Sequence, residues 1–222
     1  METITVKIEF LEEVLGLSSA NREIYSEFTG KNSPDAKSRE EEIAAIGADE
    51  FMGKVRTIFP KINGKPVVWD YQIKGMFKDF CRMLSRAKGT RSSNITAFVK
   101  VIDGLIFVAP RAITLEIPKG EELGECQRPL RVQGPKGERV ALAASETCPV
   151  GTTMIFRIDW YELKKSKDSL RETIIEWLDY GVLRGFSQWR NSGKGRFRWE
   201  EIVEKETETR RLDAKRNREE SK

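Results

Sequence analysis

The sequence predicts an α+β fold of the ferredoxin-like type, in which a βαββαβ chain forms an antiparallel sheet backed by helices. Three observations predict it. Thr3 to Phe10 alternates apolar and polar residues, as a half-buried strand does. Two segments, beginning at Asp70 and Asp168, place apolar residues at helical spacing, and strand-like stretches follow each of them. With the intervening segments set aside, the order is strand, helix, strand, strand, helix, strand.

Length and turn signals set the expected domain organisation. The chain has 222 residues, enough to bury a core without disulfides or metals. Segments rich in Gly, Pro and charged residues interrupt the main elements, so we expect one domain over residues 1–204 with insertions at about 21–68 and 118–150. Residues 205–222 are rich in charge of both signs and are expected to form a frayed helix or disordered tail.

Turn residues delimit the shorter elements. Asn63-Gly64 is a strong signal for a two-residue hairpin with its return strand at Pro66–Trp69. A second hairpin is expected around the turn 134–137. We expect Gly181 to end the second helix, which begins near Asp168. The remaining strand-like stretches are an apolar run at Leu105–Val108 and alternating segments at Ile113–Ile117, Thr153–Tyr161 and Arg196–Val203.

The first helix has a basic face. Lys74, Lys78, Arg82 and Arg86 recur every four residues, and Asp79 is the one acid that interrupts them. Repulsion between these cations is not offset within the helix, so the face is a candidate contact for a polyanion. The alternative is a solvated outer face, and the sequence leaves both readings open.

The stretch from Gly185 to Trp199 combines three features of nucleic-acid sites. Gly193 and Gly195 allow positive φ, and we expect their backbone N–H groups to be exposed as a nest for phosphate oxygens. Basic side chains attract a polyanion, and aromatic rings stack unpaired bases. The alternative is a basic loop whose aromatic side chains only pack on the core. The interleaved residues are Phe186, Trp189, Arg190, Lys194, Arg196, Phe197, Arg198 and Trp199.

Composition excludes several classes of site. The chain has no histidine, which removes mechanisms and metal sites that need imidazole. Cys81, Cys126 and Cys148 are odd in number and lack CxxC spacing, so we expect neither a disulfide framework nor a zinc site. We expect no cofactor, no metal and no catalytic residue. The cysteines and an N-terminus without signal-peptide pattern favour the cytoplasm, with no membrane contact.

Three segments resemble the RAMP superfamily, the RNA-holding subunits and guide-processing nucleases of CRISPR systems. They are the first strand with its small-residue turn, Ile4–Asn21, the helix opening Tyr71–Lys78 with its Lys74-Gly75 pair, and the glycine-rich end from Gly181 to Phe197, which is the most specific match. Small residues in the first turn leave room for a ligand or a second backbone, or form an ordinary loop. The chain also resembles proteins found in prophages of Gram-positive bacteria.

The resemblance implies an RNA-binding role, because in this family the glycine-rich loop and nearby basic residues contact the backbone of the guide RNA. Expected partners are RNA or single-stranded DNA, CRISPR effector proteins, or further copies of this chain in a bacterial host cell. With the basic helix face, the candidate nucleic-acid-binding residues are Lys74, Lys78, Arg82, Arg184, Trp189, Arg190, Gly193, Lys194, Gly195 and Arg196.

Two other functions stay open. A phage-encoded inhibitor that mimics a CRISPR subunit or occupies its RNA site would present the same loop to protein, with Trp189 as an anchor. A metal-dependent nuclease would need paired carboxylates, and none stands out. Some RAMP subunits cut RNA with an Asp in a loop after the first strand, where Asp35 lies, but a lone Asp in a polar loop is typically a turn former. Guide-processing members commonly use His, which is absent, so the sequence favours a non-catalytic binder.

Overall fold

The structure is a computed structural model that describes residues 1–19, 56–134, 137–164 and 169–203. Asp35, most of the expected first insertion and the C-terminal tail lie outside these ranges. In the part of the chain that is described, no helix is long and apolar enough to cross a membrane.

A four-stranded antiparallel sheet forms the body, with the strand order β12-β1-β11-β7. Helix α3 (Asp70–Leu84) lies between the first and second of these strands in sequence, and α5 (Leu170–Arg184) between the third and fourth. This is the predicted βαββαβ connectivity, and the ferredoxin-like α+β prediction is confirmed. The strands are β1 (Glu2–Phe10), β7 (Ile106–Ala109), β11 (Thr153–Trp160) and β12 (Phe197–Glu201).

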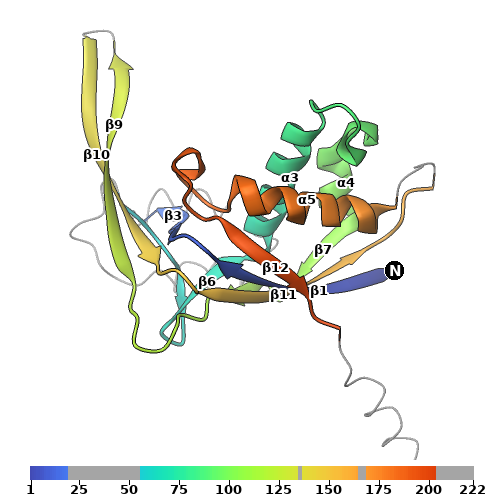
Figure 1. Cartoon of the computed structure of the whole chain (residues 1–222), viewed down its shortest axis with the longest axis horizontal. Coiled ribbons are helices and arrows are strands. Elements are labelled where there is room, and N and C mark those ends of the chain that lie inside the picture. The colour runs from blue at the N-terminus through green and yellow to red at the C-terminus, as the bar shows by residue number, and fades with distance from the viewer. Residues whose placement is uncertain (20–55, 135–136, 165–168, 204–222) are drawn as a thin grey trace, which may run out of the picture.

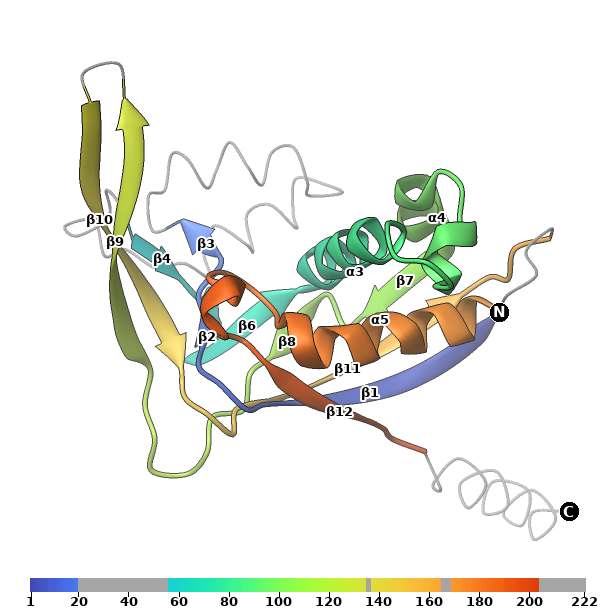
Figure 2. The ribbon, with the colours of Figure 1, turned by 45° about the horizontal axis from the view of Figure 1, so that its top comes forward.

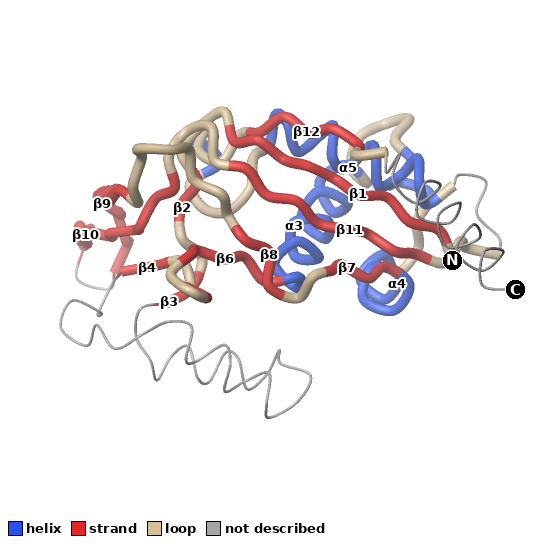
Figure 3. Tube along the Cα trace, turned by 90° about the horizontal axis from the view of Figure 1, so that it is seen from below, coloured by secondary structure: helices blue, strands red, loops and turns tan. Residues whose placement is uncertain are grey.

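The helices lie on one face of the sheet, and the alternation in β1 decides which face that is (Figures 1 and 3). The even-numbered apolar residues of β1, from Ile4 to Phe10, are at most 2% exposed and pack against the helices. Burying such side chains stabilises the fold by about 1.5–3 kcal/mol each. The helices contribute Ile73, Phe77, Phe80, Cys81, Leu170, Ile174, Trp177 and Leu178 to the same core.

The other face of the sheet is charged and internally paired. Lys7 Nζ lies 2.8 Å from Glu200 Oε1 across β1 and β12. On the same face, Arg198 Nη2 lies 2.8 Å from Glu9 Oε2. RNA-recognition modules of this frame stack bases on aromatic side chains of that face. On β1 and β12, cross-strand ion pairs occupy that face in this protein.

The second helix runs past its expected end, and the prediction that Gly181 stops it is wrong. The helix continues to Arg184, and Gly185, with φ 78°, caps it. A Cβ at Gly181 would lie 2.4 Å from Phe197 Cζ and 2.8 Å from Phe80 Cε2. This glycine therefore lets α5 pack closely on α3 and β12 and does not supply a left-handed cap.

Between α3 and β7 the chain forms two helical elements that the sequence patterns did not predict. These are the short 3₁₀ helix η1 (Arg91–Asn94) and α4 (Phe98–Leu105), which packs beside α3 (Figure 1). Ile102 of α4 is fully buried. The consequence for the site is that α4 brings Asp103 to the basic face of α3.

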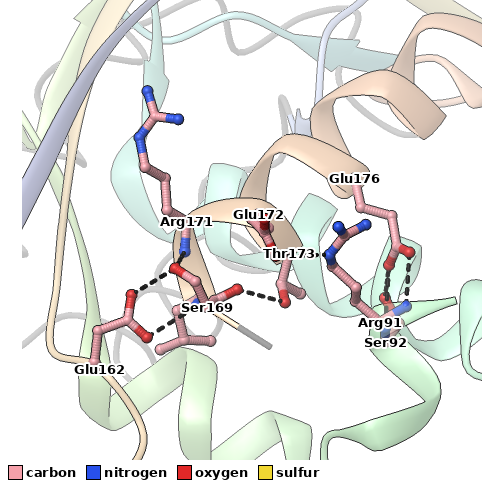
Figure 4. A network of polar contacts seen from close by, with 9 residues as sticks. Arg91, Ser92, Glu162, Ser169, Arg171, Glu172, Thr173 and Glu176 are labelled. Carbon is pink, nitrogen blue, oxygen red and sulfur yellow. Dashed lines mark hydrogen bonds and ion pairs between the residues drawn. The ribbon is translucent and has the colours of Figure 1, made fainter. Parts of the chain in front are cut away.

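Two carboxylates anchor α5 to its neighbours (Figure 4). Glu162, just after β11, accepts hydrogen bonds from Leu170 N at 2.9 Å and Ser169 Oγ at 2.9 Å, which fixes the N-terminus of the helix. Glu176 accepts from Ser92 Oγ at 2.7 Å and from the backbone N of Arg91 at 2.7 Å, which joins the helix to η1. The anchored helix delivers the glycine-rich loop to a fixed place.

A long hairpin projects from the body beside that loop (Figures 1 and 2). Its strands, β9 (Gly124–Gly134) and β10 (Gly137–Cys148), are longer than the turn signals alone predicted. The base of β10 pairs with β2 (Val14–Leu15) and β4 (Arg56–Ile58), and β4 also pairs with β3 (Ser18–Ser19). The first strand therefore continues directly into the base of the projecting hairpin.

A small third sheet, in the order β5-β6-β8, completes the described part of the chain. The Asn63-Gly64 hairpin is confirmed, because both residues have positive φ, 51° and 77°, between β5 (Lys61–Ile62) and β6 (Lys65–Trp69). β8 (Ala112–Thr114) is shorter than the expected strand at this position.

Candidate nucleic-acid interface

The glycine-rich loop joins α5 to β12 and lies beside β2 and β3 (Figure 2). Its two ends cross, since Phe186 N donates to Gly195 O at 2.8 Å. A Cβ at Gly195 would lie 2.0 Å from Phe186 O, and one at Gly185 would lie 2.7 Å from Lys194 O. Only glycine permits this crossing, and it holds the residues between 186 and 194 as a compact projection.

The backbone N–H groups of Gly193 and Gly195 are not exposed, contrary to expectation. Gly193 N donates to Arg190 O at 2.9 Å, closing the 3₁₀ turn η2 (Arg190–Ser192). Gly195 N donates to Glu13 O at 2.9 Å. Both amides therefore have partners inside the protein, and the expected phosphate nest at these two glycines is not formed.

Three of the four interleaved aromatic side chains belong to the core or its border. Phe186 and Phe197 are at most 2% exposed and pack with Phe10, at ring-centroid distances of 6.1 and 6.3 Å. Trp199 packs against the core, and its Nε1 donates to Asp179 Oδ1 at 3.0 Å. For these three, the core-packing alternative holds.

Trp189 differs from the other three. Its side chain is 40% exposed, and its φ of 55° is left-handed, which is uncommon for a bulky residue. Arg128 at the base of β9 lies under the ring, 5.4 Å from its centroid. Arg128 is 7% exposed and is held by Ser145 Oγ at 3.1 Å and Gln188 Oε1 at 2.8 Å. A strained aromatic residue presented on a fixed cation is typical of a binding surface.

Arg128 was not among the residues that the sequence singled out. No motif marks it, because its role depends on the pairing of β9 with β10, which brings the hairpin base to the loop. In the sequence, Arg128 is marked only by its position a few residues before the expected turn, and this position does not distinguish it from other arginines.

Two predicted cations of the loop region share one carboxylate. Arg190 Nη1 lies 2.5 Å and Arg184 Nε 3.4 Å from Asp79 Oδ2 on α3. The three side chains are each about a quarter exposed, at 24%, 25% and 26%. The cluster therefore has one positive charge more than it has negative, and solvent reaches it.

Lys194 is also paired, whereas Arg196 is not. Lys194 Nζ lies 2.6 Å from Glu13 Oε2, and this hydrogen bond raises the pKa of Lys194. Arg196 is exposed, and among the residues that the structure describes it has no ion pair. The loop thus presents one unpaired and two paired cations.

The basic face of α3 is divided between an internal and an exposed part. Lys78 Nζ lies 2.5 Å from Asp103 Oδ1, and Lys74 Nζ donates to Asp103 O at 3.3 Å. Burial lowers the pKa of Lys74, which also lies 5.2 Å from the ring centroid of Phe107. Arg82, farther along the helix, is exposed and has no ion pair within the described ranges.

A groove of about 430 Å³ runs between α3, the β2–β3 segment and the glycine-rich loop. Its walls are largely apolar, and Asp79 and Arg190 stand at its rim. Gly16 contacts a second backbone here, since a Cβ would lie 2.5 Å from Ile58 C. Gln188 Nε2 donates to Gly16 O at 3.0 Å, which joins the loop to the first turn. The three stretches that carry the family resemblance therefore meet around one groove.

The described part of the chain contains no group of three or more His, Cys, Asp or Glu side chains that could hold a metal ion.

No protein-family model matches the sequence, and no match was found among curated proteins. Among solved structures, the chain is similar to a chain of the Type III-B Cmr-beta complex bound to cognate target RNA, with 13% identity and a TM-score of 0.52 over 90% of its length. The match spans 58% of that chain. A chain of a Type IV-B CRISPR complex matches with 10% identity and a TM-score of 0.46, covering 92% of both chains. The protein thus shares the fold of a subunit of a CRISPR complex.

Proposed function

We propose that the chain binds RNA or single-stranded nucleic acid, without catalysis, at the surface formed by the glycine-rich loop and the adjacent part of α3. The observation that carries the proposal is Trp189, an exposed aromatic residue fixed over Arg128 in a left-handed conformation. The same loop carries Arg190, Lys194 and Arg196, cations of the kind that attract a nucleic-acid strand.

The fold likeness supports this proposal and a RAMP-type role as a subunit that holds guide or target RNA. The Cmr-beta complex in that structure is bound to cognate target RNA, and the fold likeness to its matching chain covers 90% of this protein. The meeting of the three family-like segments around one groove supports the same assignment.

The ion pairs of the loop are compatible with phosphate binding. Both pairs are part-buried but reached by solvent, and pairs at a protein surface are worth about 0–1 kcal/mol, so we expect a strand of closely spaced phosphates to displace Asp79 from Arg190 and Glu13 from Lys194. In the unbound protein these carboxylates then hold the cations in position, and phosphate groups replace them when RNA binds.

The test measures binding of labelled single-stranded RNA by fluorescence anisotropy at several salt concentrations. Replacing Arg190 and Lys194 together by alanine should weaken binding about tenfold or more, and by a similar factor for different sequences, because both contacts are to phosphate. The matched control replaces Lys65 and Arg157, which are paired with Glu116 and Asp159 on other surfaces.

The control variant should bind like the parent. Equal loss of RNA affinity in both variants would show that binding depends on overall charge and not on the loop. A loss of affinity confined to the control would place the RNA elsewhere, including on the open face of the sheet where Arg157 lies.

The second candidate is an inhibitor that acts on a CRISPR protein. The observation that favours it is that Arg190 and Lys194 are already paired, which leaves Trp189 as an exposed group of the loop beside a single exposed cation, Arg196. Exposed tryptophans are frequent anchors of protein interfaces. Capture of CRISPR effector subunits that survives ribonuclease treatment and is lost in Trp189→Ala would favour this function over RNA binding.

A further inference from the structure

Gly75 is a helix-interior glycine that packing within the described part of the chain does not explain. A glycine inside a helix costs about 1 kcal/mol relative to alanine. At Gly181 on α5 the cost has a reason, since Phe197 and Phe80 occupy the space of a side chain. At Gly75 on α3 a Cβ would meet no heavy atom within 4 Å. Gly75 lines the groove, so the space that its missing side chain leaves belongs to the groove.

The chemistry of the groove suits a flat, partly polar group attached to an anion. Met76 and Phe186 give it apolar surface, and a volume of about 430 Å³ falls within the range of small-molecule sites. Ser18 also lines it; the residue is 3% exposed, and its Oγ has no hydrogen-bond partner among the residues that the structure describes. At the rim, Arg190 and the Arg184 beside it carry one positive charge beyond that of Asp79.

We propose that this groove holds one unstacked nucleobase of the bound strand, with Gly75 as its floor and Arg190 at the adjoining phosphate. Base edges present N–H and carbonyl groups that can satisfy the Ser18 hydroxyl, and base faces suit the apolar walls. The absence of a side chain at position 75 lets the base approach the helix backbone. This inference rests on the proposed function, and it adds a site distinct from the stacking surface of Trp189.

The experiment compares a short oligoadenylate RNA with a strand of the same length made of abasic ribose phosphates. Gly75→Leu fills the groove, and Gly104→Leu is the matched control, because Gly104 is also an open glycine on a helix but lies on α4 away from the groove. Leucine has a higher helix propensity than glycine, so the urea midpoint of Gly75→Leu should equal or exceed that of the parent.

The parent should bind the base-bearing strand about tenfold more tightly than the abasic strand. Gly75→Leu should lower this preference several-fold, leaving the part that stacking on Trp189 supplies, and should keep its affinity for the abasic strand, whereas Gly104→Leu should keep the full preference. Gly75→Ala should show an intermediate preference in a protein whose fold is at least as stable.

Three results would overturn the inference. A base preference that survives undiminished in Gly75→Leu but disappears in Trp189→Ala assigns the bases to Trp189 alone. Equal binding of both strands by the parent leaves the phosphate-binding function intact and removes the base site. Binding of neither strand by the parent removes the proposed function, and the base site with it.

Discussion

Single glycines set the distances between the main elements of this protein. Gly181 places α5 against Phe80 of α3 and Phe197 of β12, and Gly195 lets the two ends of the glycine-rich loop cross at Phe186. In sequence these glycines look alike, as flexible points or helix ends. In the fold they are contact points, where the absence of a side chain decides how closely two backbones approach.

Replacing Gly181 by alanine should therefore destabilise the fold. The new Cβ would lie 2.4 Å from Phe197 Cζ, and overpacking of this kind costs about 1–3 kcal/mol. Urea denaturation should show a lower midpoint with an unchanged slope. Gly104→Ala is the control, because a Cβ there meets nothing within 4 Å and should be neutral or stabilising. A Gly181→Ala protein as stable as the parent would contradict the packing described for α5.

The cysteines should differ in reactivity according to burial. Burial raises the pKa of Cys81 to about 11 and also raises the pKa of Cys148, and both are fully buried. Cys126 on β9 is partly exposed. A maleimide reagent near neutral pH should modify Cys126 alone in the folded protein and all three cysteines in urea, as measured by mass spectrometry.

Cys126 also reports on the proposed site, because it lies on β9 two residues before Arg128, which contacts the ring of Trp189. Bound single-stranded RNA should slow its modification. Rapid modification of Cys81 or Cys148 in the folded state would contradict the burial of those two side chains.

At the scale of elements, the βαββαβ frame and the apolar face of α3 could be predicted from the sequence, because the apolar residues of β1 and α3 recur with clear strand and helix periodicity. α4 was missed, since it is only eight residues long and contains a glycine. The basic residues were found, but not their partners. Glu13, Asp79 and Asp103 reach Lys194, Arg190 and Lys78 from other elements, and no spacing within the chain records such tertiary contacts.

The proposal that Asp79 holds Arg190 and Arg184 in position until a phosphate replaces it can be tested directly. Asp79→Asn removes the carboxylate that Arg190 and Arg184 share, so the local charge rises by one and RNA should bind more tightly, with a steeper dependence on salt. The control with the same change in net charge is Glu116→Gln, which releases Lys65 at the small third sheet. Weaker binding by Asp79→Asn would mean that the carboxylate is needed to orient the arginines in the complex.

The junction between β11 and α5 should make stability depend on pH in the acid range. Burial acts to raise the pKa of Glu162, but hydrogen bonds from Leu170 N, Trp160 Nε1 and Ser169 Oγ outweigh it and lower that pKa below the ordinary 4.5. A carboxyl whose folded-state pKa is depressed stabilises the fold above its unfolded-state pKa. This contribution is lost as the pH falls from 4.5 through the folded-state value.

Glu162→Gln removes that titration. The urea midpoint of the parent should decline over this range by more than that of the variant, and the two proteins should converge in strong acid. Parallel curves for both proteins would show that Glu162 does not contribute through its charge.

At the scale of the whole molecule, a net charge of +4 is small for a protein proposed to bind a polyanion. Its distribution explains how it can suffice. On the open face of the sheet Lys7 and Arg198 are cancelled by Glu200 and Glu9, so that surface adds little to the field. Around the loop and the groove, Arg196 has no ion pair with any described residue, and two arginines share one carboxylate. The field that steers a strand therefore comes from one region and not from the sum over the chain.

A localised field predicts a shallow but measurable salt dependence. Each phosphate neutralised on a single strand contributes about −0.7 to the slope of log K against log salt. Contacts from Arg190, Lys194 and Arg196 should therefore give a slope of about −2, and the Arg190→Ala, Lys194→Ala double variant should retain about a third of it. A slope several times steeper in the parent would require a wider basic surface that includes the exposed Arg82 of α3. The bound RNA would then extend along that helix. A slope near zero would instead indicate a neutral contact, as expected if the exposed Trp189 anchors a protein partner.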